Sequence, residues 1–77
     1  MGPKPTRVTN RVRQLRAGAG DMTQAELARR LGVTRQTVIA IEHGRYSPSL
    51  EMAFQIAHVF ERTLDDVFQY EAPTPPD

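Results

Sequence analysis

Two helical patterns that follow each other almost without a gap restrict the fold of this chain more than any other feature. They run from Thr23 to Gly32 and from about Thr34 to Gly44, so that only three residues, centred on Val33, join them. Helices with so short a connection have to cross at a steep angle, and we expect Val33 to fill the corner between them. Any fold of this chain has to contain the angled pair.

Three further helical patterns accompany the pair. Helices are predicted from Asn10 to Ala17, from residues 47–49 onward, and from Thr63 to Phe68. The spacing of apolar residues predicts that the inward-facing side chains are Val12, Leu15, Leu27, Ala28, Leu31, Val38, Ile41, Leu50, Ala53, Phe54, Ile56, Ala57 and Phe60. The sequence therefore predicts an all-α domain of five helices.

The two ends of the chain differ from its middle. Both contain several prolines and few apolar residues. We predict a flexible basic arm over residues 1–9, a folded domain over residues 10–70 and a disordered tail over residues 71–77. No stretch alternates apolar and polar residues with a period of two, so no sheet is expected, with a short paired strand at residues 69–71 as the alternative.

The composition excludes several classes of protein. Seventy-seven residues allow one domain with a modest core, and the absence of cysteine excludes disulfides and thiolate zinc sites. The longest apolar run, from Val38 to Ile41, has four residues, against the roughly 18 that a membrane span needs. No secretion signal is visible. We expect a cytoplasmic, nucleoid-associated protein with no membrane partner.

Catalytic chemistry lacks its necessary parts. His43 and His58 have no partners that would complete a metal site, and no glycine-rich loop follows a strand. Asp65 and Asp66 follow Thr63, where carboxylates favour the start of a helix. We therefore expect no enzyme, no metal and no cofactor, and no pocket for a small-molecule effector is evident.

Charge is distributed unevenly along the chain. The first 45 residues carry nine Lys and Arg against three Asp and Glu, whereas the remaining 32 carry one base and six acids. Eight of the nine bases are arginine, whose planar guanidinium group suits phosphates and guanine edges. The asymmetry agrees with nucleic-acid binding, although alone it agrees equally with a solubility pattern.

The side chains on the outward face of the helix after Thr34 suit contact with a DNA groove better than exposure to water. On a helical wheel Thr34, Val38 and Ile41 face inward. The outward side begins with an arginine and a glutamine, continues with small or apolar residues, and comprises Arg35, Gln36, Ile39, Ala40 and His43. An ordinary helical hairpin would carry mixed charges here, and Ile39 suits a thymine methyl better than water. The angled pair is therefore interpreted as a DNA-binding helix-turn-helix.

Seven short segments of this chain, taken in their order and spacing, form a characteristic pattern. They are Asn10-Arg11, Leu15-Arg16, Thr23 to Ala28, Leu31 to Val38, Ile41 to Gly44, Pro48-Ser49-Leu50 and Leu64 to Phe68. Together they resemble the xenobiotic-response-element (XRE) family of helix-turn-helix regulators, the Cro and phage-repressor type. The resemblance implies a lambda-repressor-like bundle of bacterial or phage kind. Two connections depart from the family pattern, since the loop over residues 18–22 is one residue longer and Glu61-Arg62 replaces a glycine turn.

The resemblance also implies roles for individual residues. Those implied to read bases in the major groove are Thr34, Arg35, Gln36, Ile39 and Ala40. Those implied to contact phosphates are Gln24, Thr37, His43 and Arg45. Arg35 can donate two hydrogen bonds to guanine, and Gln36 can pair twice with adenine. The alternatives are a plain helix-start role for Gln24 and a solvated side chain for His43.

A second set of residues is implied to be structural. In the family, an arginine of the first helix and a glutamate near the end of the third form a partly buried ion pair, here Arg16 and Glu42. The remaining amino-terminal bases are either an arm that reaches the DNA backbone or a solvated tail, and they are Lys4, Arg7, Arg11 and Arg13.

A domain of this size contacts few base pairs, so we expect a homodimer on a palindromic operator with half-sites roughly 34 Å apart. The candidate interface comprises Val67, Phe68 and Tyr70; alternatively, Val67 and Phe68 only close the core. The expected function is transcriptional regulation, as a repressor, with double-stranded DNA as the partner. The alternative is an antitoxin whose main partner is a toxin protein, although the seven residues after Tyr70 are a short segment for binding one.

Overall fold

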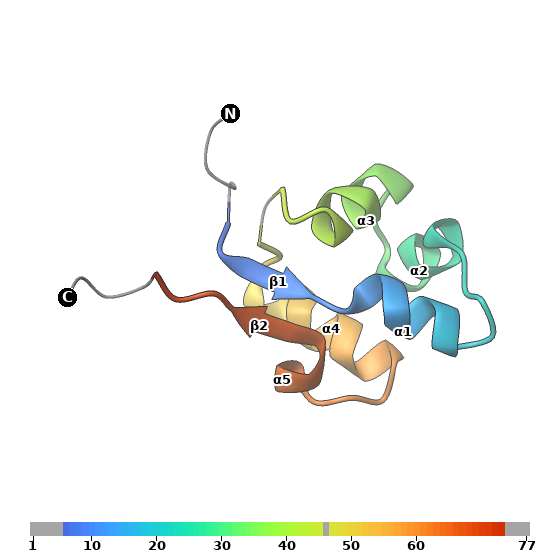
Figure 1. The fold of residues 1–77 in the computed structure, drawn as a ribbon. Coiled ribbons are helices and arrows are strands. Elements are labelled where there is room, and N and C mark those ends of the chain that lie inside the picture. Colours follow the sequence, from blue (N-terminus) through green and yellow to red (C-terminus); the bar gives the residue numbers. More distant parts are fainter. Residues whose placement is uncertain (1–5, 46, 74–77) are drawn as a thin grey trace.

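The computed structural model describes residues 6–45 and 47–73 of the chain. Within them, five helices and two short strands follow in the order β1 (Val8–Asn10), α1 (Val12–Gly18), α2 (Gln24–Leu31), α3 (Arg35–Glu42), α4 (Leu50–Val59), α5 (Leu64–Val67) and β2 (Phe68–Tyr70) (Figure 1). The five predicted helices are present. The first begins two residues later than predicted, because Asn10 belongs to a strand.

Four of the five helices begin directly after a hydroxyl side chain. In each case the hydroxyl accepts a hydrogen bond of 3.0 to 3.2 Å from the amide three residues on, and the four residues are Thr23, Thr34, Ser49 and Thr63. The carboxylate of Glu26, in the first turn of α2, accepts hydrogen bonds from Arg29 and Arg30. The positions at which α2 to α5 begin are therefore set by local chemistry.

The two ends of the described chain pair as an antiparallel ribbon. Val8 lies opposite Tyr70 and Asn10 lies opposite Phe68. The expectation of no sheet is therefore wrong, and the alternative of a short paired strand at residues 69–71 is confirmed to within one residue by β2. Val8 and Thr9 belong to β1 rather than to a flexible arm. Strands of three residues are too short to show a period of two, and their partners are about 60 residues away in the chain. Residues 1–5 of the expected arm and 74–77 of the expected tail lie outside the described residues.

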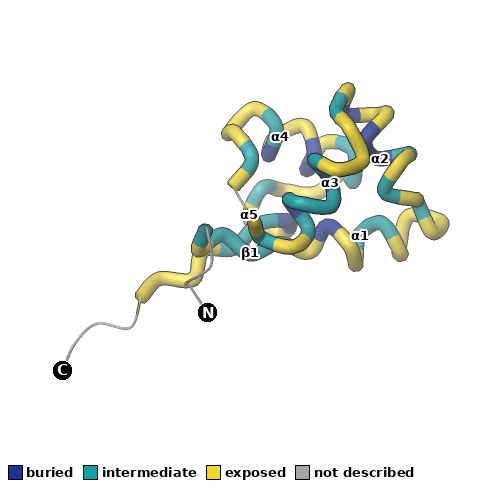
Figure 2. Tube along the Cα trace, turned by 90° about the horizontal axis from the view of Figure 1, so that it is seen from above, coloured by how far each residue is buried: buried dark blue, intermediate teal, exposed yellow. Residues whose placement is uncertain are grey.

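Every helix contributes to a single apolar core. Its most deeply buried large side chains are Val12, Leu27, Val38, Ile41, Ile56 and Val67. Figure 2 shows the buried stretches of the helices facing the middle of the molecule. The inward face predicted for α4 is too broad, because Leu50 and Phe54 are 66% and 53% exposed. The smaller Ala53 and Ala57, together with Ile56, make up the buried side of that helix.

The turn between α2 and α3 has the geometry that a steep crossing needs. Gly32 adopts a left-handed conformation with a φ of 72°, and its amide donates to the carbonyls of Ala28 and Arg29. Val33 follows and packs half-buried against the core. Val38 and Ile41 hold α3 to the body, which leaves the opposite side of this helix at the surface.

Candidate nucleic-acid interface

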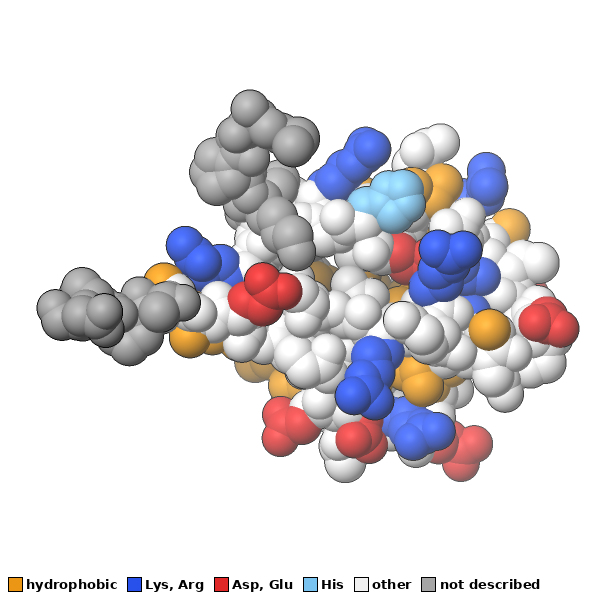
Figure 3. Space-filling view, viewed as in Figure 1, with side chains coloured by type: hydrophobic (Ala, Val, Ile, Leu, Met, Phe, Trp, Pro, Cys, Tyr) orange, Lys and Arg blue, Asp and Glu red, His pale blue; other side chains and the backbone are white. Residues whose placement is uncertain are grey.

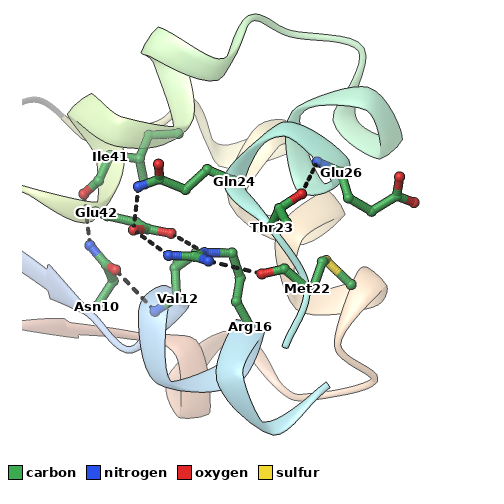
Figure 4. A network of polar contacts seen from close by, with 9 residues as sticks. All are labelled: Asn10, Val12, Arg16, Met22, Thr23, Gln24, Glu26, Ile41 and Glu42. Carbon is green, nitrogen blue, oxygen red and sulfur yellow. Dashed lines mark hydrogen bonds and ion pairs between the residues drawn. The ribbon is translucent and has the colours of Figure 1, made fainter. Parts of the chain in front are cut away.

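A polar network fixes the carboxyl-terminal end of α3 to α1 and α2 (Figure 4). Arg16 donates to both carboxylate oxygens of Glu42, from Nε over 2.5 Å and from Nη2 over 3.0 Å. Gln24 Nε2 donates to Oε1 of the same carboxylate over 3.1 Å. The Glu42 side chain is 4% exposed and that of Arg16 is 15% exposed. The two residues expected to pair therefore form a bidentate, largely buried ion pair.

The protonation of Glu42 follows from competing effects on its pKa. Burial alone raises the pKa of this carboxyl group, because it disfavours the charged form. Hydrogen bonds from Arg16 and Gln24 act in the opposite direction, as do the positive charges of Arg16 and Arg13. The net result is a pKa below the usual value, so Glu42 is an anion at neutral pH.

Three further hydrogen bonds complete the network. Asn10 Nδ2 donates to the carbonyl of Ile41 over 2.8 Å, while Asn10 Oδ1 accepts from the amide of Val12. Arg16 Nη1 donates to the carbonyl of Met22 over 2.8 Å. Sequence reasoning missed this role of Asn10, which joins the end of β1, the start of α1 and the last turn of α3. An asparagine two residues before a helix was the available signal.

An open hollow of about 600 Å³ lies above this network, between α1, α2 and α3. It is lined by Arg13, Arg16, Thr23, Gln24, Ala25, Arg35, Glu42 and His43. The hollow brings Gln24, Arg35 and His43 together, although they come from two different helices. Its arginines outnumber its single carboxylate, which is already paired, so the surface presents excess positive charge to a ligand.

Arg13 is the residue of this surface that sequence reasoning misplaced. On sequence alone, Arg13 is expected to belong either to an arm that reaches the DNA backbone or to a solvated tail, whereas the structure places it in α1 at the rim of the hollow. The signal was its position three residues before Arg16, because residues three apart share a helix face. Arg7 and Arg11 are exposed but do not line this hollow.

The outward edge of α3 lies at the surface beside the hollow. Arg35 and Gln36 at its start are exposed, and Ile39 and Ala40 one turn later are half-buried. The inward placement of Thr34 on the helical wheel is wrong, because this residue is exposed at the cap position, where its hydroxyl accepts from the amide of Thr37. The residues expected to read bases therefore occupy one accessible strip, and the apolar part of this strip is shielded in part by its neighbours.

The residues expected to contact phosphate occupy different surroundings. Gln24 is half-buried and bonded to Glu42, so it braces α3 as well as lining the hollow. The hydroxyl of Thr37 lies 3.1 Å from that of Thr34. Arg45 is exposed beyond the end of α3 and does not line the hollow, although its amide donates to the carbonyl of Ala40. These side chains flank the outward edge of α3 rather than forming one cluster.

The upper part of this face is mostly basic. Figure 3 shows basic side chains and a histidine over α3 and its surroundings, while acidic and basic side chains alternate along the lower edge. The excess of bases in the first half of the sequence thus appears on the surface around α3. A polyanion that approaches α3 meets the positive side.

The expected dimer residues are only partly at the surface. Val67 is fully buried in the monomer, so its assignment to an interface is wrong. It closes the core because α5 has four residues and turns this side chain inward. Phe68 is half-buried and Tyr70 is 67% exposed, so both still offer surface to a partner.

Fold and surface together define a class of protein. A steeply crossed helix pair, an accessible second helix and a basic surface around it are the features of a helix-turn-helix DNA-binding domain.

Among the described residues, none of the helices has the length and apolar character that a membrane span requires.

The family follows from comparison with known proteins. The model of the helix-turn-helix family matches residues 12–67. The chain belongs to the XRE-type helix-turn-helix family of transcriptional regulators. It is 55% identical over 51 residues to the uncharacterized HTH-type transcriptional regulator MJ0272 of Methanocaldococcus jannaschii, covering 66% of this chain and 77% of that protein. It is 48% identical over 62 residues to the uncharacterized HTH-type transcriptional regulator YgzD of Bacillus subtilis, covering 80% and 92%.

A known structure supports the fold. The crystal structure of a Bacteroides fragilis protein named for DNA binding superimposes with a TM-score of 0.70, covering 80% of this chain and 98% of that one. At 19% identity this likeness concerns the fold alone. The two relatives matched by sequence come from an archaeon, Methanocaldococcus jannaschii, and from a bacterium, Bacillus subtilis.

Proposed function

We propose that this regulator binds a specific double-stranded DNA sequence by placing the outward edge of α3 in the major groove. The observation that carries the proposal is the exposed strip that begins with Arg35 and Gln36, on a helix whose other end is fixed by the Glu42 network. A helix held in this way offers its reading side chains without a large loss of freedom on binding.

The chemistry of the strip gives each member a task. Arg35 donates twice to a guanine, and Gln36 pairs with an adenine, each discriminating by about 1–3 kcal/mol. Ile39 and Ala40 give apolar contact to thymine methyl groups. Thr34 lies at the first turn, where the hydroxyl that caps α3 can also face a base.

Phosphate binding supplies most of the affinity and none of the sequence preference. Gln24 and His43 line the basic hollow, and we add Arg13 to them because it lies on the same rim. Thr37 and Arg45 contact the backbone on the other side of α3. The proposal therefore separates residues that read from residues that anchor.

The regulator acts as a homodimer on a palindromic operator, and as a repressor when that operator overlaps a promoter. One copy of α3 reads too few base pairs for useful specificity, and a two-fold dimer doubles them at a spacing of roughly 34 Å. Phe68 and Tyr70 remain candidate contacts. The antitoxin alternative finds no support in the comparisons, because the relatives matched by sequence are described as HTH-type transcriptional regulators.

Selection from random duplexes, followed by titration of the best site at several salt concentrations, tests the proposal. Arg35→Ala is expected to relax preference at one position of each half-site, because it removes a base contact. Arg45→Ala is expected to weaken all sequences alike and to reduce the salt slope by about one unit per monomer.

Arg62→Ala is the matched control, since it removes the same charge from an exposed site in the acidic half of the chain that does not line the basic hollow. It should leave both preference and salt slope unchanged. Failure to select any preferred duplex would refute specific binding. Identical behaviour of the Arg35 and Arg45 variants would refute the separation of reading from anchoring.

A further inference from the structure

The side chain of Asn10 bonds two parts of the molecule at once. Its Oδ1 accepts from the amide of Val12 over 3.1 Å, and its Nδ2 donates to the carbonyl of Ile41 over 2.8 Å. The first bond stays within the entry to α1, whereas the second joins residues 31 positions apart. The two partners also fix the orientation of the amide group, because one of them donates and the other accepts. The position therefore needs a side chain that can do both.

The carbonyl that Asn10 holds lies where α3 supplies few donors of its own. Ile41 is the last residue but one of the helix, and the carbonyls of a last turn lack an amide four residues on within the helix. The amide of Gly44 reaches this carbonyl over 3.0 Å, and the amide of Arg45 bonds Ala40 instead. Asn10 adds a donor from outside α3, so it ties the end of the helix to the ribbon.

Three elements hold this end of α3 from different sides. Arg16 approaches Glu42 from α1, and Gln24 approaches it from α2. Asn10 reaches the neighbouring carbonyl, that of Ile41, from the end of β1 (Figure 4). The bond from β1 thus acts on the backbone of the helix, while the other two act on one of its side chains.

The strand end that carries Asn10 is itself attached to the body. The amide of Arg11 donates to the carbonyl of Val67 over 2.9 Å, and the Val67 side chain is fully buried. Asn10 lies opposite Phe68 in the ribbon, and Val12 beyond it is 1% exposed in the core. The tie to α3 starts from a fixed point, and it transmits the position of β1 to the end of the helix.

A small rotation at this end of α3 is magnified at the other. With a rise of about 1.5 Å per residue, Arg35 lies roughly 10 Å from Glu42 along the helix axis. A tilt of about 10° around the fixed end moves the backbone of Arg35 by roughly 2 Å, whereas hydrogen-bond lengths vary over only about 0.5 Å. Base contacts from Arg35 and Gln36 are therefore sensitive to the tilt that the far end sets.

We propose that Asn10 is a positioning residue for DNA recognition: through the carbonyl of Ile41 it makes the ribbon set the tilt of α3. The inference rests on the proposed DNA-binding function and names a residue and a strand that adjust the recognition helix. Asn10 is half-buried and does not line the basic hollow, so it acts through Ile41 rather than on the DNA.

Asn10→Ser tests the proposal, because serine keeps an acceptor for the amide of Val12 but is too short to reach Ile41. Thr63→Ala is the matched control, since it also removes one bond between a side chain and the backbone, at the start of α5 and outside the basic hollow. Fluorescence anisotropy measures binding to a duplex with a single selected half-site, at a temperature at which circular dichroism shows every variant folded. We expect Asn10→Ser to weaken binding about tenfold, the scale of one impaired base contact, and Thr63→Ala to weaken it less than about twofold. The order of base preferences and the salt slope should stay unchanged in both.

The tilt of α3 is measured directly in the free protein. Residual dipolar couplings of its backbone amides, fitted in the frame of α2 and α4, should show a reorientation of α3 in Asn10→Ser and none in Thr63→Ala. Asn10→Asp keeps the shape of the side chain and the acceptor for Val12, but it places an oxygen where Nδ2 donates. This variant should therefore reorient α3 as Asn10→Ser does.

Several results would overturn the proposal. They are unchanged half-site binding by Asn10→Ser, an equal loss of binding in Thr63→Ala, and an α3 with wild-type couplings in either Asn10 variant. A changed order of base preferences would instead make Asn10 a base contact, and it would equally overturn the positioning role. Failure of the proposed function is recognised separately, because the wild-type chain would then select no preferred duplex.

Discussion

Replacing Glu42 with leucine tests the energetic role of the network behind α3. The change removes the acceptor of two hydrogen bonds from Arg16 and one from Gln24. Arg16 then keeps its bond to the carbonyl of Met22, but its charge is unpaired while its side chain is only 15% exposed. A stranded charge at that depth costs about 3 kcal/mol. In a domain of this size the cost corresponds to a fall in Tm of roughly 12 to 24 °C.

The double variant Arg16→Met, Glu42→Leu separates the cost of a stranded charge from the value of the pair. With both charges removed, stability should return to within about 1 kcal/mol of the wild type, because apolar replacements of a buried pair are often neutral. Urea and thermal unfolding of the wild type, both single variants and the double variant give the coupling energy.

Glu51→Leu is the matched control, since Glu51 is an exposed acid in the first turn of α4 and should change stability by less than about 1 kcal/mol. A Glu42→Leu variant as stable as the wild type would contradict the reasoning. So would a double variant no more stable than the single one, because the loss would then not come from the unpaired guanidinium.

Three further predictions concern local structure. Gly32→Ala should cost about 1 kcal/mol in unfolding experiments, because φ is positive although space for a Cβ is open; no change would contradict the turn geometry. Glu26, paired with Arg29 and Arg30, should titrate by NMR with a pKa of about 2, so its contribution to stability should be present above about pH 4.5 and be lost as pH falls toward 2; a pKa near 4.5 would contradict the pairing. Val67→Ala should cost about 2–3 kcal/mol while leaving the oligomeric state unchanged, and dissociation of a dimer would return Val67 to the interface.

The helices were predictable because their signals are local. A hydroxyl at Thr34 bonds an amide three residues later, and a glycine at position 32 takes the left-handed turn, whatever the rest of the chain does. The ion pair between Arg16 and Glu42 could be expected only from the family resemblance. Nothing within either helix shows that residues 26 positions apart meet.

The features that the sequence did not reveal depend on distant contacts. The ribbon forms because the two ends of the domain meet, and the sequence indicated only its second strand, as an alternative at residues 69–71. A strand of three residues carries no periodic signal. The exposure of Leu50 and Phe54 depends on how much of α4 the neighbouring helices cover. A helical wheel gives the direction of a side chain, but it does not give the width of the surface that covers the helix.

The attachment of α3 is asymmetric, and this asymmetry bears on how specificity can change. Its last turn is tied to α1, α2 and β1 through Glu42 and the carbonyl of Ile41, whereas its first turn is held by the cap at Thr34 and exposes Arg35 and Gln36. If α3 enters the groove as proposed, substitutions at the first turn should alter the groups offered to DNA without breaking a buried bond. Substitutions at the last turn should instead loosen the helix and reduce affinity for every sequence together. Under the proposed function, reading and positioning would fall at opposite ends of one eight-residue helix, and the domain could acquire a new operator without a change in its fold or its core.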